Sequence, residues 1–136
     1  MGIRQQKPEK GKKIQAHPSS SELAQKNPPT FSLRYLDKGY CLSKCEQEEK
    51  AAFADTLHKL SQLTWQQINQ APRHGLGFEK IAGDSIKGTI PPHLRGQDVN
   101  FIAFRFHGQA PMVGYRDQSV FYVIWLDRAF TLYNHG

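Results

Sequence analysis

Cysteine is scarce in this chain, and its two copies, Cys41 and Cys45, stand alone with a CxxxC spacing. A structural zinc site needs about four ligands, and no second cysteine pair completes one. The six histidines are scattered, without HxH or HxxxH spacing. We therefore predict no metal site and no cofactor, and we expect two reduced thiols in a cytoplasmic protein.

Long apolar runs are also missing from the sequence. No stretch approaches the roughly 20 apolar residues that a membrane-spanning helix needs. The N-terminal region resembles neither a signal peptide nor an amphipathic transit helix, because it has no apolar run of useful length. We therefore expect no membrane association and no targeting helix.

Large aliphatic residues are few in the first 29 positions, where only Ile3, Ile14 and Leu23 occur among six Lys/Arg and two Glu. Such a segment cannot bury enough apolar surface to offset the entropy of ordering it. We predict a disordered basic arm over residues 1–29 and a folded domain over 30–136. The arm carries +4 of the net charge of +6, which leaves +2 for the domain. The arm either attracts RNA or DNA through salt-sensitive contacts or only keeps the protein soluble.

The residues that remain predict a strand followed by two helices. Alternating apolar residues from Phe31 to Tyr35 indicate the strand. Two capping boxes, in which a hydroxyl and a side chain three residues later satisfy free backbone donors, start the helices at Ser43 and Thr64. The first helix should run to about Gln62, and the second should end before the proline at position 72. The predicted buried residues of these helices are Phe53, Leu57, Leu60, Leu63, Trp65 and Ile68.

The C-terminal half predicts a loop followed by an antiparallel sheet. Residues 73–96 are rich in glycine and proline, which favours an irregular connector. Residues 100–135 contain three or four short strands joined by tight turns, and such strands pair antiparallel. The predicted fold class is therefore α+β: a strand, two helices, then a three- to four-stranded antiparallel meander, with the helices packed on one face of the sheet.

The turns of this meander predict which side chains share a face. Two-residue turns at 108–109 and 117–118 would place Arg105 opposite Met112, His107 opposite Ala110 and Phe101 opposite Arg116. One face would then be apolar and buried, with Ile102, Phe104, Phe106, Val113, Tyr115, Val120, Tyr122, Ile124 and Leu126. The other would be a mixed face of cations and aromatic rings, which suits a groove, with Phe101, Arg105, His107, Met112, Arg116, Phe121, Val123 and Trp125.

Several short motifs resemble a known family. They are GFEKI at 77–81 in the connector, FRF at 104–106 on the first meander strand, and DR at 127–128 followed by LY at 132–133. Together with the order of elements, these resemble the glycine-rich segment, the arginine-bearing strand and the closing signature of the RelE/ParE superfamily. Its members are toxins of bacterial type II toxin–antitoxin systems.

The resemblance to the RelE/YoeB-like branch implies a metal-independent endoribonuclease that cuts mRNA on the ribosome. In that chemistry, basic side chains hold the scissile phosphate while the 2′-hydroxyl of the substrate attacks it. Arg105 and Arg128 would hold the phosphate, and Glu79 would be the base. Tyr133 would be the acid/base or base-stacking residue of the closing signature, and His135 stands where that branch has its terminal His-Tyr pair. The further RNA-binding candidates are Lys80, Lys87, His107 and Arg116.

The partners implied by the resemblance are a cognate antitoxin, the ribosome and mRNA. Two alternatives stay open from the sequence. A ParE-type protein keeps the fold but inhibits DNA gyrase without any RNA chemistry, and a noncatalytic module binds RNA or a partner without cleaving it. The substitution Tyr133→Phe separates them, because only the nuclease depends on that hydroxyl.

Overall fold

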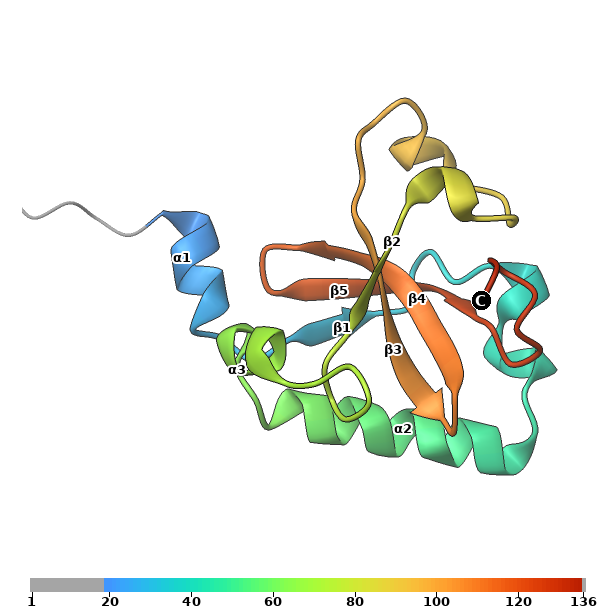
Figure 1. Ribbon diagram of the computed structural model, residues 1–136, viewed down its shortest axis with the longest axis horizontal. Helices are drawn as coiled ribbons and strands as arrows, with labels where there is room; N and C mark the ends of the chain where they lie inside the picture. Colours follow the sequence, from blue (N-terminus) through green and yellow to red (C-terminus); the bar gives the residue numbers. More distant parts are fainter. Residues whose placement is uncertain (1–18, 136) are drawn as a thin grey trace, which may run out of the picture.

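The computed structural model of the protein describes residues 19–135, which form helices around one sheet (Figure 1). The α-helices are α1 (Ser20–Gln25), α2 (Gln47–Ser61) and α3 (Trp65–Gln70). The strands are β1 (Thr30–Ser32), β2 (Glu79–Ile81), β3 (Phe101–His107), β4 (Ala110–Asp117) and β5 (Val120–Leu126). Short 3₁₀ turns lie at Lys38–Tyr40, Leu42–Lys44, Gly83–Ser85 and Pro92–Leu94.

The strands of the described residues form one five-stranded sheet in the order β1-β5-β4-β3-β2. Successive strands from β2 to β5 pair antiparallel, whereas β1 pairs parallel with β5. The fold class is therefore α+β, as predicted, and the sheet is mixed. The parallel pairing of β1 was not foreseen, because it joins residues 90 positions apart in the sequence.

The two predicted helices form, but only one starts where the sequence indicated. At α3, the Thr64 hydroxyl accepts from the Gln67 backbone N–H and the Gln67 side chain accepts from that of Thr64, as predicted. The predicted start of α2 at Ser43 is wrong, because residues 42–44 form a 3₁₀ turn. The helix begins after Glu46, whose backbone N–H donates to Oε1 of Glu49 at 2.6 Å. The capping box of α2 is therefore formed by Glu46 and Glu49 and not by Ser43 and Glu46.

Residues 19–29 correct the predicted N-terminal arm, because they include the helix α1. Ser19 and Glu22 form a reciprocal capping box there, and Ala24 is buried. The following segment is tied to α3, since the backbone N–H of Trp65 donates to the carbonyl of Asn27 at 3.0 Å. Local capping and tertiary contacts order this stretch despite its low apolar content. The rest of the predicted arm, residues 1–18, lies outside the described residues.

Both faces of the sheet are buried, and this corrects the predicted mixed face. Helices α2 and α3 cover one face, along the lower side of the sheet in Figure 1. The connector and the C-terminal segment cover the other. The helix-side core contains Phe53, Leu60, Trp65, Ile68, Ile102, Phe104, Phe106, Met112, Phe121, Val123 and Leu126. The loop-side core contains Ile81, Leu94, Phe101, Ala103, Val113, Ile124, Trp125, Leu132 and Tyr133.

Two irregularities in the sheet explain why the predicted faces were wrong. His107 does pair with Ala110, but the register shifts between Arg105 and His107, so that Arg105 pairs with Pro111 and Phe101 with Tyr115. A second shift lies between Val113 and Gly114, and the β4–β5 turn is at 118–119 rather than 117–118. Because side chains alternate along a strand, each one-residue shift exchanges the faces beyond it.

The predicted irregular connector at 73–96 contains the short strand β2, which pairs with β3 and forms one edge of the sheet. The rest of the connector is held against the sheet by aromatic contacts. The His93 ring stacks on Tyr35 with centroids 4.0 Å apart, and its Nε2 lies 2.9 Å from the hydroxyl of Tyr115. Tyr115 in turn stacks on Tyr122. These mutual contacts fix the connector over the loop-side core.

Among residues 19–135, no helix has the length and apolar character needed to cross a membrane. The two cysteines are both free, Cys41 partly exposed and Cys45 buried.

Candidate functional site

A cleft of about 520 Å³ opens beside the C-terminal segment on the loop side of the sheet. Its walls come from the segment before β2, from β2 itself, from the β3–β4 hairpin and from the last residues of the chain. Four residues expected from the sequence lie on it: Glu79, Arg105, Tyr133 and His135. The other lining residues are Arg73, Ala103, Gln109, Pro111, Phe130 and Asn134.

The register of β2 against β3 brings two of these residues to the cleft. Glu79 pairs with Ala103, and Arg105 is two positions further along the same face of β3. Lys80 lies between Glu79 and Ile81 and pairs with Ile102, which belongs to the helix-side core. The alternation of side chains therefore directs Lys80 to the opposite face of the sheet.

The cationic wall of the cleft consists of Arg73 and Arg105. Nη1 of Arg73 lies 3.5 Å from Oε1 of Glu79, and their side chains are 57% and 41% exposed. An ion pair this exposed is weak and opens readily. Nη1 of Arg105 donates to Nδ1 of His74 at 3.0 Å and lies 3.5 Å from the carbonyl oxygen of Arg73. Arg105 is thus bound to residues 73–74, the segment that also carries the Arg73 guanidinium.

The C-terminal segment, which also lines the cleft, begins with a tight turn built on Asp127. This residue follows β5 and is fully buried. Its Oδ1 accepts from the backbone N–H of Thr131 at 2.8 Å, and its Oδ2 accepts from that of Leu132 at 3.0 Å. Phe130, inside the turn, has a positive φ of 60° and is 44% exposed at the rim of the cleft. A bulky side chain in this conformation costs on the order of 1–3 kcal/mol, which the surrounding bonds offset.

Tyr133 and His135, near the end of the described residues, stack their rings beside this turn. The His135 ring lies on that of Tyr133 with centroids 4.0 Å apart and planes inclined by 27°. Nε2 of His135 is 3.1 Å from Oδ2 of Asp127. Burial raises the pKa of Tyr133 to about 12, with the charges of Glu79 and Asp127 adding to the effect and Arg105 opposing it. The Tyr133 hydroxyl therefore keeps its proton at neutral pH.

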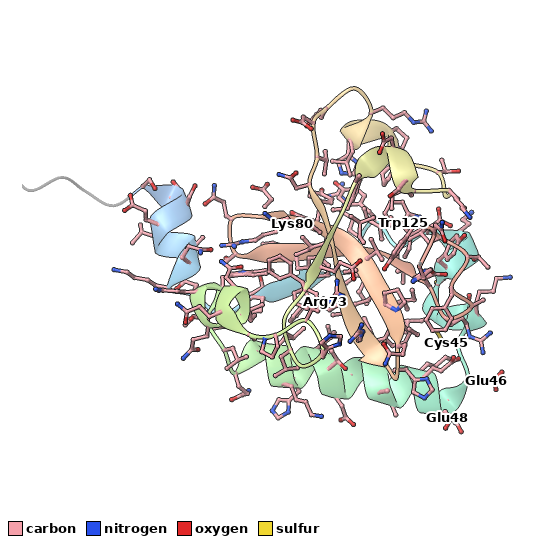
Figure 2. The ribbon with its side chains drawn as sticks, viewed as in Figure 1. Cys45, Glu46, Glu48, Arg73, Lys80 and Trp125 are labelled. Carbon is pink, nitrogen blue, oxygen red and sulfur yellow. The ribbon has the colours of Figure 1, made fainter. Side chains whose placement is uncertain are left out.

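Arg128, which the sequence placed in the phosphate-binding set, does not lie on this cleft. Its Nε donates to Oε1 of Glu49 at 2.8 Å, and its Nη2 lies 3.8 Å from Oε2 of Glu46. The hydrogen bond to Glu49 raises the pKa of the Arg128 guanidinium. In Figure 2 the segment around Cys45 and Glu46 lies at one end of the molecule, away from Arg73. Arg128 therefore joins the C-terminal turn to the start of α2.

The remaining RNA-binding candidates are also dispersed. Arg116 lies over the Trp65 ring, 4.2 Å from its centroid, and its Nε donates to the carbonyl of Gln118. His107 ends β3, pairs with Ala110 and does not line the cleft. Lys87 is an exposed connector residue whose backbone N–H donates to the carbonyl of Leu132. The structure thus does not gather Lys80, Lys87, His107 and Arg116 into one surface with the cleft.

The sequence reasoning missed three residues that build the cleft: Arg73, Asp127 and Phe130. Arg73 stands at the start of a segment that looked like an irregular loop. Asp127 was noticed only as a neighbour of Arg128. The alternation of polar and apolar residues in DRAFTLYNH at 127–135 gave no sign of a tight turn, although an aspartate followed by a threonine four residues later is compatible with one.

Comparisons of the chain with protein-family models, curated proteins and solved structures gave no match. In residues 19–135 no group of three or more His, Cys, Asp or Glu side chains is placed to hold a metal ion. The cleft itself combines two guanidinium groups, a half-exposed carboxylate, an imidazole and a protonated phenol. Such a set can hold an anion and exchange protons next to it.

Proposed function

We propose that this protein is the toxin of a type II toxin–antitoxin system, an endoribonuclease that cuts mRNA on the ribosome. The observation that carries the proposal is the meeting of Glu79, Arg105, Tyr133 and His135 on one cleft. These residues were chosen on the sequence resemblance alone, and they come from β2, β3 and the C-terminal segment. The cleft adds a second cation, Arg73, in place of Arg128.

In the proposed reaction, the 2′-hydroxyl of a nucleotide attacks the adjacent phosphorus. Arg105 and Arg73 hold the phosphoryl oxygens and stabilise the extra negative charge of the five-coordinate transition state. Glu79 accepts the proton of the 2′-hydroxyl. When RNA binds, the phosphate takes the place of Glu79 beside Arg73, which frees the carboxylate for this step. The bond to the 5′-oxygen breaks, and the products carry a 2′,3′-cyclic phosphate and a 5′-hydroxyl.

The leaving 5′-oxygen needs a proton, and the cleft offers two groups that carry one. Tyr133 has a pKa of about 12 and is therefore a donor rather than a base near neutral pH. His135 stacks on Tyr133 and shares its wall of the cleft. We assign donation of this proton to His135 in its protonated, imidazolium form, which leaves the ring neutral after the step, and we assign Tyr133 a hydrogen bond to the phosphoryl group.

The proposal places the protein in the cytoplasm, with the ribosome, mRNA and an antitoxin as partners. Within the described residues, β2 is an edge strand of the sheet and lies beside the cleft. An antitoxin segment that added a strand to β2 would also cover Glu79 and Arg73, which explains neutralisation by simple blockage.

The chemistry of the new RNA ends tests the proposal. Wild-type protein is added to a bacterial translation extract, and cut mRNA is assayed for 2′,3′-cyclic phosphate ends. We expect Glu79→Gln and Tyr133→Phe to lower the yield of such ends by about 10²-fold. Tyr40→Phe is the matched control, because the Tyr40 hydroxyl lies 3.4 Å from Thr131 Oγ1 outside the cleft. Intact mRNA combined with inhibited DNA gyrase would contradict the proposal and favour the ParE-type alternative.

A further inference from the structure

Asp127 is the one fully buried carboxylate among the described residues, and the reaction above assigns it no part. We infer that Asp127 is a positioning residue, which fixes the orientation and tautomer of His135 at the cleft. The catalytic consequence of this inference rests on the proposed function. The geometric part does not, because it concerns only the contacts within the C-terminal turn.

Backbone hydrogen bonds fix the position of the Asp127 carboxylate independently of its contact with His135. A buried carboxylate needs hydrogen-bond donors to replace the water it has lost. Two of these come from the backbone N–H groups of Thr131 and Leu132, one on each oxygen. The backbone N–H of Phe130 also donates to the Asp127 carbonyl, at 3.3 Å. The position of Oδ2 is thus set by the turn itself.

His135 is then oriented by three contacts of different kinds. Its Nε2 meets Oδ2 of Asp127 at 3.1 Å, its face lies on Tyr133, and the ring of Phe130 meets it edge-on with centroids 5.2 Å apart. A carboxylate oxygen only accepts, so Nε2 must carry a hydrogen. In the protonated ring, the proton that passes to the leaving oxygen is then the one on Nδ1, because the Nε2 hydrogen is held by Asp127. The side chain stays 26% exposed, which leaves it accessible from the cleft.

A purely structural role for Asp127 makes different predictions. If the carboxylate only closed the turn, both tautomers of His135 would be populated. Substitutions of Asp127 and His135 would then lower the cleavage rate independently of each other. Asparagine at position 127 separates the two cases. Its amide has one acceptor oxygen for three donors, so it cannot keep both backbone bonds and the contact with His135.

The tautomer of His135 is measured first, by nitrogen-15 NMR of the histidine side chains in the wild-type protein. The spectrum of His135→Gln identifies the His135 signals. We expect the Nε2–H tautomer in the wild type and a mixture of tautomers in Asp127→Asn. Asp37→Asn is the matched control, because the Asp37 side chain accepts a backbone N–H from Gly39 at 2.8 Å and has no hydrogen bond or ion pair with a histidine among the described residues. A wild-type His135 with its hydrogen on Nδ1 would overturn the inference, whether or not Asp127→Asn folds.

Cleavage rates test the catalytic part. We expect Asp127→Asn to lower kcat by roughly 10- to 100-fold with little change in KM, measured below the melting temperature of the variant. In a His135→Gln background the same substitution should lower kcat by no more than about twofold. Losses that multiply would overturn the inference. If the wild type cuts no RNA but holds the Nε2–H tautomer, the nuclease proposal fails and the positioning of His135 by Asp127 stands.

Discussion

Nε of Arg128 donates a 2.8 Å hydrogen bond to Oε1 of Glu49, and this contact joins the C-terminal turn to the first turn of α2. Glu49 is only 7% exposed and also accepts from the backbone N–H of Glu46. Arg128 is the residue just after Asp127, so the pair anchors the segment that carries Tyr133 and His135. The Arg128–Glu49 pair therefore supports the position of two cleft residues without lining the cleft itself.

The Arg128–Glu49 pair should matter for stability and for its dependence on pH. Burial raises the pKa of the Glu49 carboxyl, but the hydrogen bonds from Arg128 and Glu46 outweigh this and bring the pKa below 4.5. A group whose pKa is lowered on folding stabilises the fold above its unfolded value and loses that effect as pH falls. We expect Arg128→Gln to lower the melting temperature at pH about 7 by roughly 5 °C.

Thermal melts over a range of pH test this expectation. The difference between wild type and Arg128→Gln should shrink as the pH falls from about 5 to about 3, since Glu49 becomes protonated in both proteins. Arg95→Gln is the control, because the Arg95 side chain donates to the carbonyl of Ile90 at 3.2 Å and forms no ion pair with any carboxylate among residues 19–135. A difference that is the same at every pH would show that the charge of Glu49 is not involved.

Tyr133 should give the opposite pH dependence. Its pKa is raised from 10 to about 12, chiefly by burial. A group with a raised pKa stabilises the fold fully below its unfolded value, and this effect is lost as the pH rises through the folded value. Wild-type stability should therefore fall between pH 10 and about 12, and Tyr133→Phe should lose less over that interval. Denaturant titrations at several alkaline pH values measure this, and equal losses in both proteins would contradict it.

Substitution of the two arginines should separate RNA cleavage from folding. We expect Arg105→Gln and Arg73→Gln each to lower the cleavage rate in a translation extract by about 10²-fold. Their melting temperatures should change little, because the ion pair of Arg73 with Glu79 is exposed and weak and the hydrogen bonds of Arg105 are also at the surface. Arg95→Gln should cut at the wild-type rate. If Arg73→Gln cut RNA at the wild-type rate, Arg73 would have no part in the proposed reaction.

Gly114 should tolerate no larger residue. It lies at the register shift of β4, where an added Cβ would overlap the carbonyl oxygen of Tyr122. We expect Gly114→Ala to destabilise the protein by about 3 kcal/mol or more, because strand backbone cannot move aside. Gly108→Ala is the comparison: it meets open space, and its φ of 58° costs alanine only about 1 kcal/mol. Chemical denaturation measures both, and similar losses would contradict the close-approach argument.

Local signals in the sequence predicted the features that depend on neighbouring residues. The capping box at Thr64 and the burial of Trp65 required only the next few positions along the chain. The start of α2 was wrong because Glu46 and Glu49 form an equally good local box. The strand β2 was missed because its three residues form a strand only through pairing with β3, whose partner residues lie 20 to 24 positions later in the sequence.

The candidate cleft was predictable only in part, and for a similar reason. The family resemblance predicted Glu79, Arg105, Tyr133 and His135 as site residues from short motifs, and this prediction did not depend on how the strands pair. It also pointed to Arg128, because a short motif does not show that Glu49 of α2 binds that guanidinium. Two register shifts of one residue each exchanged the predicted faces. No local pattern marks such shifts, since they follow from how the strands pack on both cores.

The most direct test of the nuclease proposal is primer extension on a defined mRNA in a bacterial translation extract, with and without the wild-type protein. The same mRNA without a start codon is the control, because it is not translated. The account predicts cuts that appear only on the translated mRNA and lie in frame with its codons. Uncut mRNA, or equal cutting of the translated and untranslated forms, would contradict it.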